Sequence, residues 1–141
     1  DILLASETAR FGQPEVNIGV MPGFGGSQRL PRRVPFGMAA EILFSGDNIT
    51  AAEALRIGLV NRLTAPAELL GEAKKLAHKM ASRAPVAVAK TKQALHTSRQ
   101  GALSDGNAQE RQLFSELFAT ADQKEGMSAF LEKRPAVYRG K

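Results

Sequence analysis

The chain contains no cysteine and no tryptophan, and only one tyrosine among its 141 residues. Without cysteine, these residues can form no disulfide, no thiolate metal site and no cysteine nucleophile, which suits a reducing compartment. No apolar run approaches the roughly 20 residues that a membrane-spanning helix needs. The sequence therefore predicts a protein with no membrane partner.

Aromatic residues make up only 6% of the chain, which weakens a nucleic-acid interpretation of its basic charge. The net charge is +5, and a basic balance can indicate a nucleic-acid partner. However, the basic residues are scattered, with Arg29, Arg32 and Arg33 as the one tight group, and side chains for stacking on single strands are scarce. A polyanionic small molecule would explain the charge equally well. We expect no nucleic-acid partner; RNA binding, the alternative, predicts an affinity that falls steeply with salt.

What the chain does have is the composition of a globular protein, with 43% hydrophobic and 23% charged residues. Its length is enough for one cored domain. The first residues, Asp1 to Ser6, have the pattern of a buried strand with no segment leading into it. We therefore expect the complete protein to contain further residues before Asp1.

Two parts of the chain differ in their expected structure. Up to residue 64 the pattern mixes strands, turns and short helices. Residues 65–141 are helical, with apolar faces that we expect to pack against either the first part or another subunit. In the first part we expect strands at Ile2–Ala5 and Leu59–Leu63, an extended segment at Phe11–Val20, a short helix at Gly25–Arg33, a buried helix at Phe36–Ser45 ended by Gly46, and a helix capped at Thr50–Glu53 and ended by Gly58. In the second part we expect helices at Pro66–Ser82 and Pro85–Arg99, a break at Gly101–Gly106, a helix carrying Leu113 to Phe118, and a last helix capped by Thr120 or Asp122.

The segment from Phe11 to Leu30 has the residue types of a candidate active site. Pro14 fixes the backbone beside Glu15, and Gly23 opens a glycine-rich turn about eight residues later. A carboxylate close to exposed backbone amides can move a proton on a polarised substrate. The turn lacks the spacing of a dinucleotide or phosphate loop. From the residues alone, Glu15 could equally be a surface or capping residue, and Gly23 part of a tight turn.

Three motifs in order resemble the enoyl-CoA hydratase (crotonase) family, and together they extend over nearly the whole chain. They are Phe11–Leu30, Leu43–Ala54 with Gly58-Leu59-Val60, and Phe118–Arg134. The resemblance is to the C-terminal half of that family. It implies an α/β fold in which residues 1–64 form the C-terminal portion of a crotonase-type ββα spiral and residues 65–141 form a helical oligomerisation region.

The resemblance also implies an activity. The family's hydratases are lyases that reversibly hydrate a 2-enoyl-CoA thioester to 3-hydroxyacyl-CoA in fatty-acid or related acyl-CoA metabolism. Glu15 matches the glutamate that gives a proton to the α-carbon, and the Gly23 amide matches a group that positions the reacting water. A second glutamate and the amides that bind the thioester oxygen would precede Asp1, so we expect residues 1–141 to be inactive alone. The alternatives are an isomerase or other enolate-stabilising enzyme of this scaffold, and a non-catalytic assembly fragment.

The family's substrate contacts and assembly extend these expectations. Pro14, Phe114, Phe130 and Lys133 match substrate-binding positions, with Lys133 near the phosphates of coenzyme A. The resemblance implies a homo-oligomer, either a trimer or a hexamer built as a dimer of trimers, in the cytoplasm or in the mitochondrial matrix of a eukaryote. It implies no cofactor, because coenzyme A is part of the substrate. No metal site is expected, because His78 and His96 lack ligand partners at suitable spacing.

Overall fold

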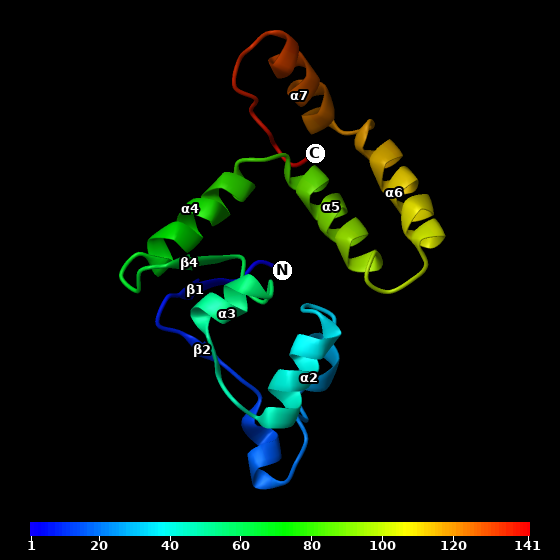
Figure 1. Cartoon of the computed structure of the whole chain (residues 1–141). Coiled ribbons are helices and arrows are strands. Elements are labelled where there is room, and N and C mark those ends of the chain that lie inside the picture. The colour runs from blue at the N-terminus through cyan, green and yellow to red at the C-terminus, as the bar shows by residue number, and fades with distance from the viewer. The chain divides into compact units, whose positions relative to one another are not determined.

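The computed structural model describes all 141 residues, which divide into two compact units, 1–74 and 75–141 (Figure 1). No helix in either unit has the length and apolar character needed to cross a lipid bilayer.

The first unit is built on two small sheets with short helices between their strands. In one sheet, β1 (Leu4–Ser6) pairs in parallel with β4 (Arg62–Thr64), and in the other β2 (Arg10–Phe11) pairs antiparallel with β3 (Ile49–Thr50). The helices are η1 (Pro14–Ile18), α1 (Gly26–Arg29), α2 (Phe36–Ser45) and α3 (Ala51–Arg56), and α4 (Leu69–Ala81) begins at the end of the unit. The predicted mixed α/β class is confirmed.

The core of the first unit consists of small and medium-sized side chains. One buried cluster contains Val34, Ala39, Ile42 and Ile57, and a second contains Ala5, Ala54 and Val60. Ile49 and Leu59 pack against both clusters. No large side chain is fully buried, so the stabilisation from apolar burial comes from many small contributions.

The start of α3 follows the predicted capping pattern in part. Thr50 Oγ1 accepts a hydrogen bond from the backbone N–H of Glu53 at 3.1 Å, which confirms Thr50 as the N-cap. The Glu53 carboxylate instead pairs with Arg56, whose Nη2 lies 2.6 Å from Glu53 Oε1. Only the first half of the capping box therefore forms. Gly58, with φ +78°, then turns the chain towards β4.

The prediction that Phe11–Val20 is extended is wrong for most of that segment. Extended pairing stops at Phe11, and Pro14–Ile18 forms a turn of 3₁₀ helix that ends at Gly19 with φ +79°. The reason is the proline: its fixed φ suits the first position of a helix as well as an extended kink. The loose alternation of apolar residues did not distinguish the two.

The helix predicted at Phe36–Ser45 forms as α2 with those bounds, and Gly46 ends it in the left-handed conformation. The expectation that this helix is buried is wrong. Ala39 and Ile42 are its buried residues, whereas Phe36 and Phe44 are 77% and 79% exposed. Only one face of α2 meets the core of its unit.

The second unit contains the end of α4 and three further helices, α5 (Pro85–Thr97), α6 (Leu103–Leu117) and α7 (Ala121–Leu131). Helices α5 and α6 lie side by side (Figure 1). A salt bridge joins Lys90 to Glu116. Thr120 caps α7 by accepting the N–H of Gln123 at 3.1 Å, which decides between the two predicted caps.

The predicted break at Gly101–Gly106 is wrong in its second half. Helix α6 starts at Leu103 and includes Gly106, whose N–H donates to the carbonyl of Ala102 at 3.1 Å. A glycine within a helix costs about 1 kcal/mol relative to alanine, which the remaining turns of a 15-residue helix can offset.

The C-terminal tail is fastened to the start of α7 by a buried carboxylate. Asp122 is 3% exposed, and its two oxygens accept the N–H groups of Arg139 at 2.7 Å and Gly140 at 2.8 Å. The N–H of Asp122 donates to the carbonyl of Lys141 at 3.0 Å. The tail therefore runs back along α7 (Figure 1). Its last residues are held by three hydrogen bonds.

We predict that Asp122→Ala releases this tail. Removal of a charged acceptor of two hydrogen bonds should speed amide exchange at Arg139 and Gly140 by about ten- to a hundredfold, since such bonds contribute roughly 1.5–3 kcal/mol each. Trypsin should also cut faster after Arg139. The control is Asp105→Ala, which removes an exposed carboxylate of α6; unchanged exchange in the Asp122 variant would contradict the prediction.

Candidate functional site

Glu15 is the second residue of η1 and is half-buried. Its Oε2 atom is shielded from solvent and has no hydrogen-bond partner. Buried polar atoms are nearly always hydrogen-bonded, so an unpartnered carboxylate oxygen requires an explanation. A group that donates or receives a proton during a reaction provides one, because its partner is then the substrate.

The turn that carries Glu15 is fixed against the end of α2. Asn17 Nδ2 donates to the carbonyl of Gly46 at 3.2 Å. A side chain on Gly46 would come within 2.9 Å of Val16 Cγ2 and 2.7 Å of Asn17 Oδ1. Since Gly46 also has φ +68°, its lack of a side chain allows both the end of α2 and the close approach of η1.

The glycine-rich turn lies next to the segment that leads into Glu15. The Oε1 atom of Gln13 occupies the space where a side chain on Gly26 would stand, 2.1 Å from that Cβ position. Gly25, with φ +87°, precedes α1, and Arg29 Nη2 donates to the carbonyl of Phe24 at 2.5 Å across the turn. The structure thus brings Gln13, two residues before Glu15, against the turn.

Gly23 differs from its neighbours in this turn. It is exposed, it has no positive φ, and a Cβ atom there would meet only the Met21 carbonyl, at 4.0 Å. Neither its conformation nor the surrounding space within the unit requires glycine. A requirement for glycine would therefore come from contact with something else, such as a bound substrate.

The residues between Glu15 and α1 expose apolar side chains. Four of them are more than half exposed: Ile18 at 80%, Val20 at 54%, Met21 at 68% and Phe24 at 94%. Pro14 is also exposed. Apolar residues concentrated in this way usually mark a surface that another molecule covers.

The candidate residues do not line the cavity that the first unit contains beside β2. It has a volume of about 330 Å³ and is lined by Arg10, Phe11, Gly12, Gln13, Leu30, Ile42 and Leu59. Neither Glu15 nor Gly23 is among these residues. Arg10 is the one charged residue in the lining, so the cavity holds no carboxylate for acid–base chemistry.

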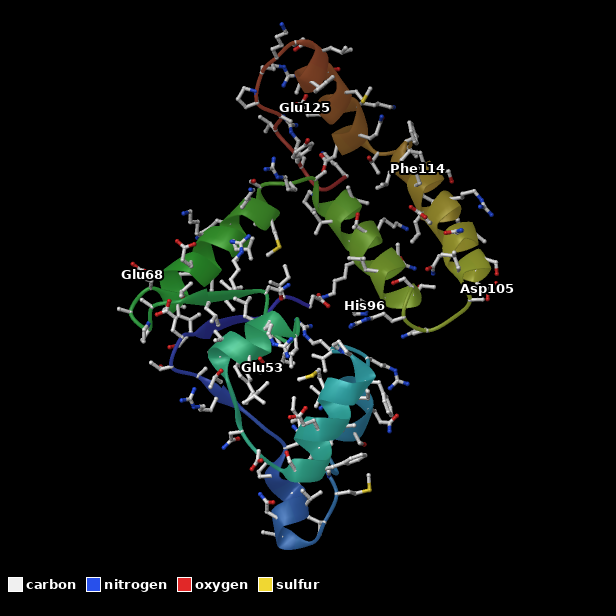
Figure 2. The ribbon with its side chains drawn as sticks, viewed as in Figure 1. Glu53, Glu68, His96, Asp105, Phe114 and Glu125 are labelled. Atoms are coloured by element: carbon white, nitrogen blue, oxygen red, sulfur yellow. The ribbon has the colours of Figure 1, made fainter.

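The aromatic candidates of the second unit are exposed. Phe114, on α6, is 62% exposed (Figure 2). Its ring meets that of Phe118 edge to face, with 5.2 Å between the ring centroids. Phe130, on α7, is 79% exposed, and Lys133 follows the end of the same helix in an exposed position. Both aromatic rings are available to a ligand or to another protein surface.

Sequence reasoning missed the ion pair between Glu125 and Arg134, which lies close to Lys133 in the chain. Arg134 forms a two-pronged ion pair with Glu125, with Nη1–Oε1 at 2.6 Å and Nη2–Oε2 at 3.0 Å, and its Nε lies 2.6 Å from Glu132 Oε2. The pKa of the Glu125 carboxyl is lowered to about 2, mainly by its hydrogen bonds to the Arg134 guanidinium and to a smaller extent by the hydrogen bond from the N–H of Val137. Helical spacing does not indicate this pair, because the chain reverses between its two members.

No three side chains of His, Asp or Glu lie close enough together to hold a metal ion. His78 and His96 lie on different helices, α4 and α5.

Comparison with known proteins identifies similar chains. A family model described as enoyl-CoA hydratase/isomerase matches residues 1–141. The chain is 53% identical over 134 residues to the short-chain-enoyl-CoA hydratase of Clostridium acetobutylicum, with 95% of this chain and 51% of that protein covered. It is 49% identical over 141 residues to the crotonyl-CoA hydratase of Syntrophomonas wolfei, with 100% and 54% covered.

The fold is similar to that of solved structures as well. The crystal structure of an enoyl-CoA hydratase from Bacillus anthracis matches with a TM-score of 0.97 and 38% identity, covering 100% of this chain and 55% of that one. In each comparison the chain spans about half the length of the protein it matches.

We predict a pH dependence for the Glu125–Arg134 pair. The pKa of Glu125 falls from an ordinary 4.5 to about 2 in the folded state, so its stabilising contribution is complete above pH 4.5 and disappears as the pH falls towards 2. The unfolding midpoint of Glu125→Gln should therefore lie below that of the unmodified protein at pH 6, and the difference should close with acidification. Glu110→Gln, which changes an exposed carboxylate of α6, is the control; a difference independent of pH would contradict the prediction.

Proposed function

Because this chain belongs to the enoyl-CoA hydratase/isomerase family, we propose that it supplies one part of the active site of an enoyl-CoA hydratase. The family predicted from the three motifs is confirmed. The proposed reaction is the reversible addition of water across the 2,3-double bond of an acyl-CoA thioester. In this proposal residues 1–64 are the C-terminal portion of the crotonase-type spiral, and the complete protein provides the rest.

The observation that carries the proposal is the buried, unpartnered Oε2 atom of Glu15. When hydroxide adds to carbon 3, a protonated Glu15 carboxyl can give its proton to carbon 2, which becomes nucleophilic in the enolate-like transition state. In this proposal the backbone amide at Gly23, whose surroundings are open, would position the water that adds to the double bond. The apolar side chains around Glu15 would exclude bulk water from this proton transfer.

A single carboxyl cannot serve both proton roles at once. The hydration also needs a base for the attacking water and donors for the thioester oxygen, whose negative charge increases in the transition state. We propose that residues preceding Asp1 provide these groups, so that residues 1–141 alone would be inactive. The thioester itself acidifies the α-position, so the proposed mechanism requires no additional cofactor.

We further propose that the candidate residues of the second unit bind the coenzyme A portion and acyl chain of the substrate. The exposed rings of Phe114 and Phe130 are suited to the apolar parts, and the Lys133 ammonium is suited to the phosphates. Pro14, also exposed, would contact the substrate beside Glu15. The proposed compartment is the cytoplasm, or the mitochondrial matrix in a eukaryote.

The helical region 65–141 is proposed to assemble as a trimer, or as a hexamer made from two trimers. Its support is the number of large apolar side chains that are more than half exposed, namely Leu70, Leu95, Leu103, Phe114, Phe118, Met127, Phe130, Leu131 and Val137. Monomeric proteins rarely leave so many large apolar residues in water, and closed symmetric assembly is the usual way to cover them.

An isomerase is the second candidate, because the family model covers hydratases and isomerases together. An isomerase would move the double bond of a 3-enoyl-CoA, with the acid placed for a different carbon. Assays of the complete protein with crotonyl-CoA and with a 3-enoyl-CoA separate the two activities.

We predict that Glu15→Gln in the complete protein lowers kcat for crotonyl-CoA hydration by about 10²- to 10⁴-fold, the range expected for loss of a general acid. Glutamine keeps the size of the side chain but cannot transfer the proton. The rate is followed from the loss of the conjugated thioester's absorbance.

Glu41→Gln is the matched control, since Glu41 is an exposed carboxylate of α2, and its activity should be unchanged. Circular dichroism should show the same fold in both variants. A fully active Glu15→Gln enzyme would reject Glu15 as the proton donor, and turnover of the 3-enoyl-CoA alone would favour the isomerase.

We predict that the complete protein sediments with the mass of three or six chains. Phe118→Asp, which places a charge among the exposed apolar residues of α6, should shift the distribution towards smaller species. Glu110→Gln on the same helix should not. A monomer at micromolar concentration would contradict the proposed assembly.

A further inference from the structure

Lys133 has the one positive φ among the non-glycine residues of the chain, at +54°. It lies just after α7, where the N–H of Arg134 donates to the carbonyl of Ala129 at 3.0 Å and closes the helix end. Glycine is the usual residue in such a left-handed position, because a side chain there strains the backbone. A lysine in this conformation implies that neighbouring contacts restrain the backbone, and it suggests that the lysine side chain has a role that glycine could not fill.

The restraint is the ion-pair group formed by Arg134. Its guanidinium binds Glu125, on α7, through two hydrogen bonds and binds Glu132 through a third. Glu125, on α7 (Figure 2), also accepts the N–H of Val137 at 2.9 Å, so the residues on both sides of the reversal are joined to α7. With residues 132 and 134 held, the orientation of the Lys133 backbone is fixed.

The ion pairs of Arg134 also determine which charged side chains of this segment are left without a partner. Arg134 engages both carboxylates of this segment. Lys133, which lies between Glu132 and Arg134 in the sequence, forms no ion pair with either carboxylate. Arg139 contributes further positive charge near Glu125. An exposed ammonium without a carboxylate partner, on a strained but restrained backbone, is suited to bind an anion from outside the unit.

We propose that the Glu125–Arg134 ion pair positions Lys133 to bind the phosphate groups of the acyl-CoA. This inference rests on the proposed function and assigns new roles to two residues. In this proposal Glu125 and Arg134 are positioning residues, since their charged groups are bound to each other rather than to the substrate. They hold the left-handed turn and keep the nearby carboxylates away from the Lys133 ammonium.

The test compares two substrates in the complete protein: crotonyl-CoA, and the crotonyl thioester of pantetheine, which lacks the phosphates. Glu125→Gln and Lys133→Ala should each raise KM for crotonyl-CoA about tenfold, with kcat within about twofold, because one charge-assisted contact is lost. KM for the pantetheine thioester should not change. The double variant should be no worse than Lys133→Ala, since both changes remove the same contact.

Glu116→Gln is the matched control. It breaks the salt bridge to Lys90 between α5 and α6 and should leave KM for both substrates unchanged. Arg134→Gln gives an independent measurement if Glu125→Gln does not fold, and it should raise KM for crotonyl-CoA to the same extent.

Lys133→Gly separates binding from stability. Glycine relieves the strain at φ +54°, so the unfolding midpoint should rise, by about 2 °C, while KM for crotonyl-CoA rises as in Lys133→Ala. A purely structural role for Lys133 would change the midpoint without changing KM.

The possible failures are distinct. If Lys133→Ala raises KM for crotonyl-CoA but neither Glu125→Gln nor Arg134→Gln does, the positioning role is wrong and the proposed function stands. If Lys133→Ala leaves KM unchanged, Lys133 does not bind the phosphates. If the unmodified protein turns over neither thioester, the proposed function and this inference both fail.

Discussion

The close approach of η1 to the end of α2 is the contact on which the candidate site depends. Gly46 has no side chain, so Val16 and Asn17 can lie directly against the end of the helix. Without that contact the short 3₁₀ turn would have few interactions of its own, because a single helical turn is unstable in water. Glu15 is therefore positioned by tertiary packing rather than by the local sequence around it.

The distribution of apolar residues has a related consequence. Alanine, valine and isoleucine fill the buried clusters of the first unit, while Phe24, Phe36 and Phe44 are each more than three-quarters exposed. Burial of a phenylalanine is worth about 1.5–3 kcal/mol. Much of the stabilisation that this sequence could provide thus depends on surfaces that cover these rings, which agrees with a chain that spans about half of its relatives.

The sequence predicted those features that depend on neighbouring residues. The bounds of α2, the cap at Thr50 and the mixed α/β class were predicted correctly, and Thr120 was one of the two caps predicted for the last helix. The errors arose where two local rules conflict. Pro14 suits either a kinked strand or a helix start, and Gly106 breaks a helix by propensity but is retained inside α6. The burial of α2 depends on the elements that pack around it, and the amino-acid composition of the helix does not specify those elements.

For the candidate site, the sequence indicated which residues to consider but not their surroundings. The resemblance to the family identified Glu15, and the structure added that one of its oxygens is buried without a partner. Its role as proton donor stays a prediction. The Glu125–Arg134 pair was not predictable, because the two residues meet only after the chain reverses at Lys133. Neither helical nor strand periodicity describes such a reversal.

The parallel pairing of β1 with β4 has a kinetic consequence. Leu3 and Asn61 are hydrogen-bonded across a sequence separation of 58 residues. The chain must lose the entropy of closing that long loop before the pairing gives any stabilisation, so contacts of this kind form slowly. Helices α2 and α3, whose backbone hydrogen bonds join residues close in sequence, can form before the two ends of the loop meet. The strand at the beginning of the chain is thus expected to join its sheet late in folding, well after it has been synthesised.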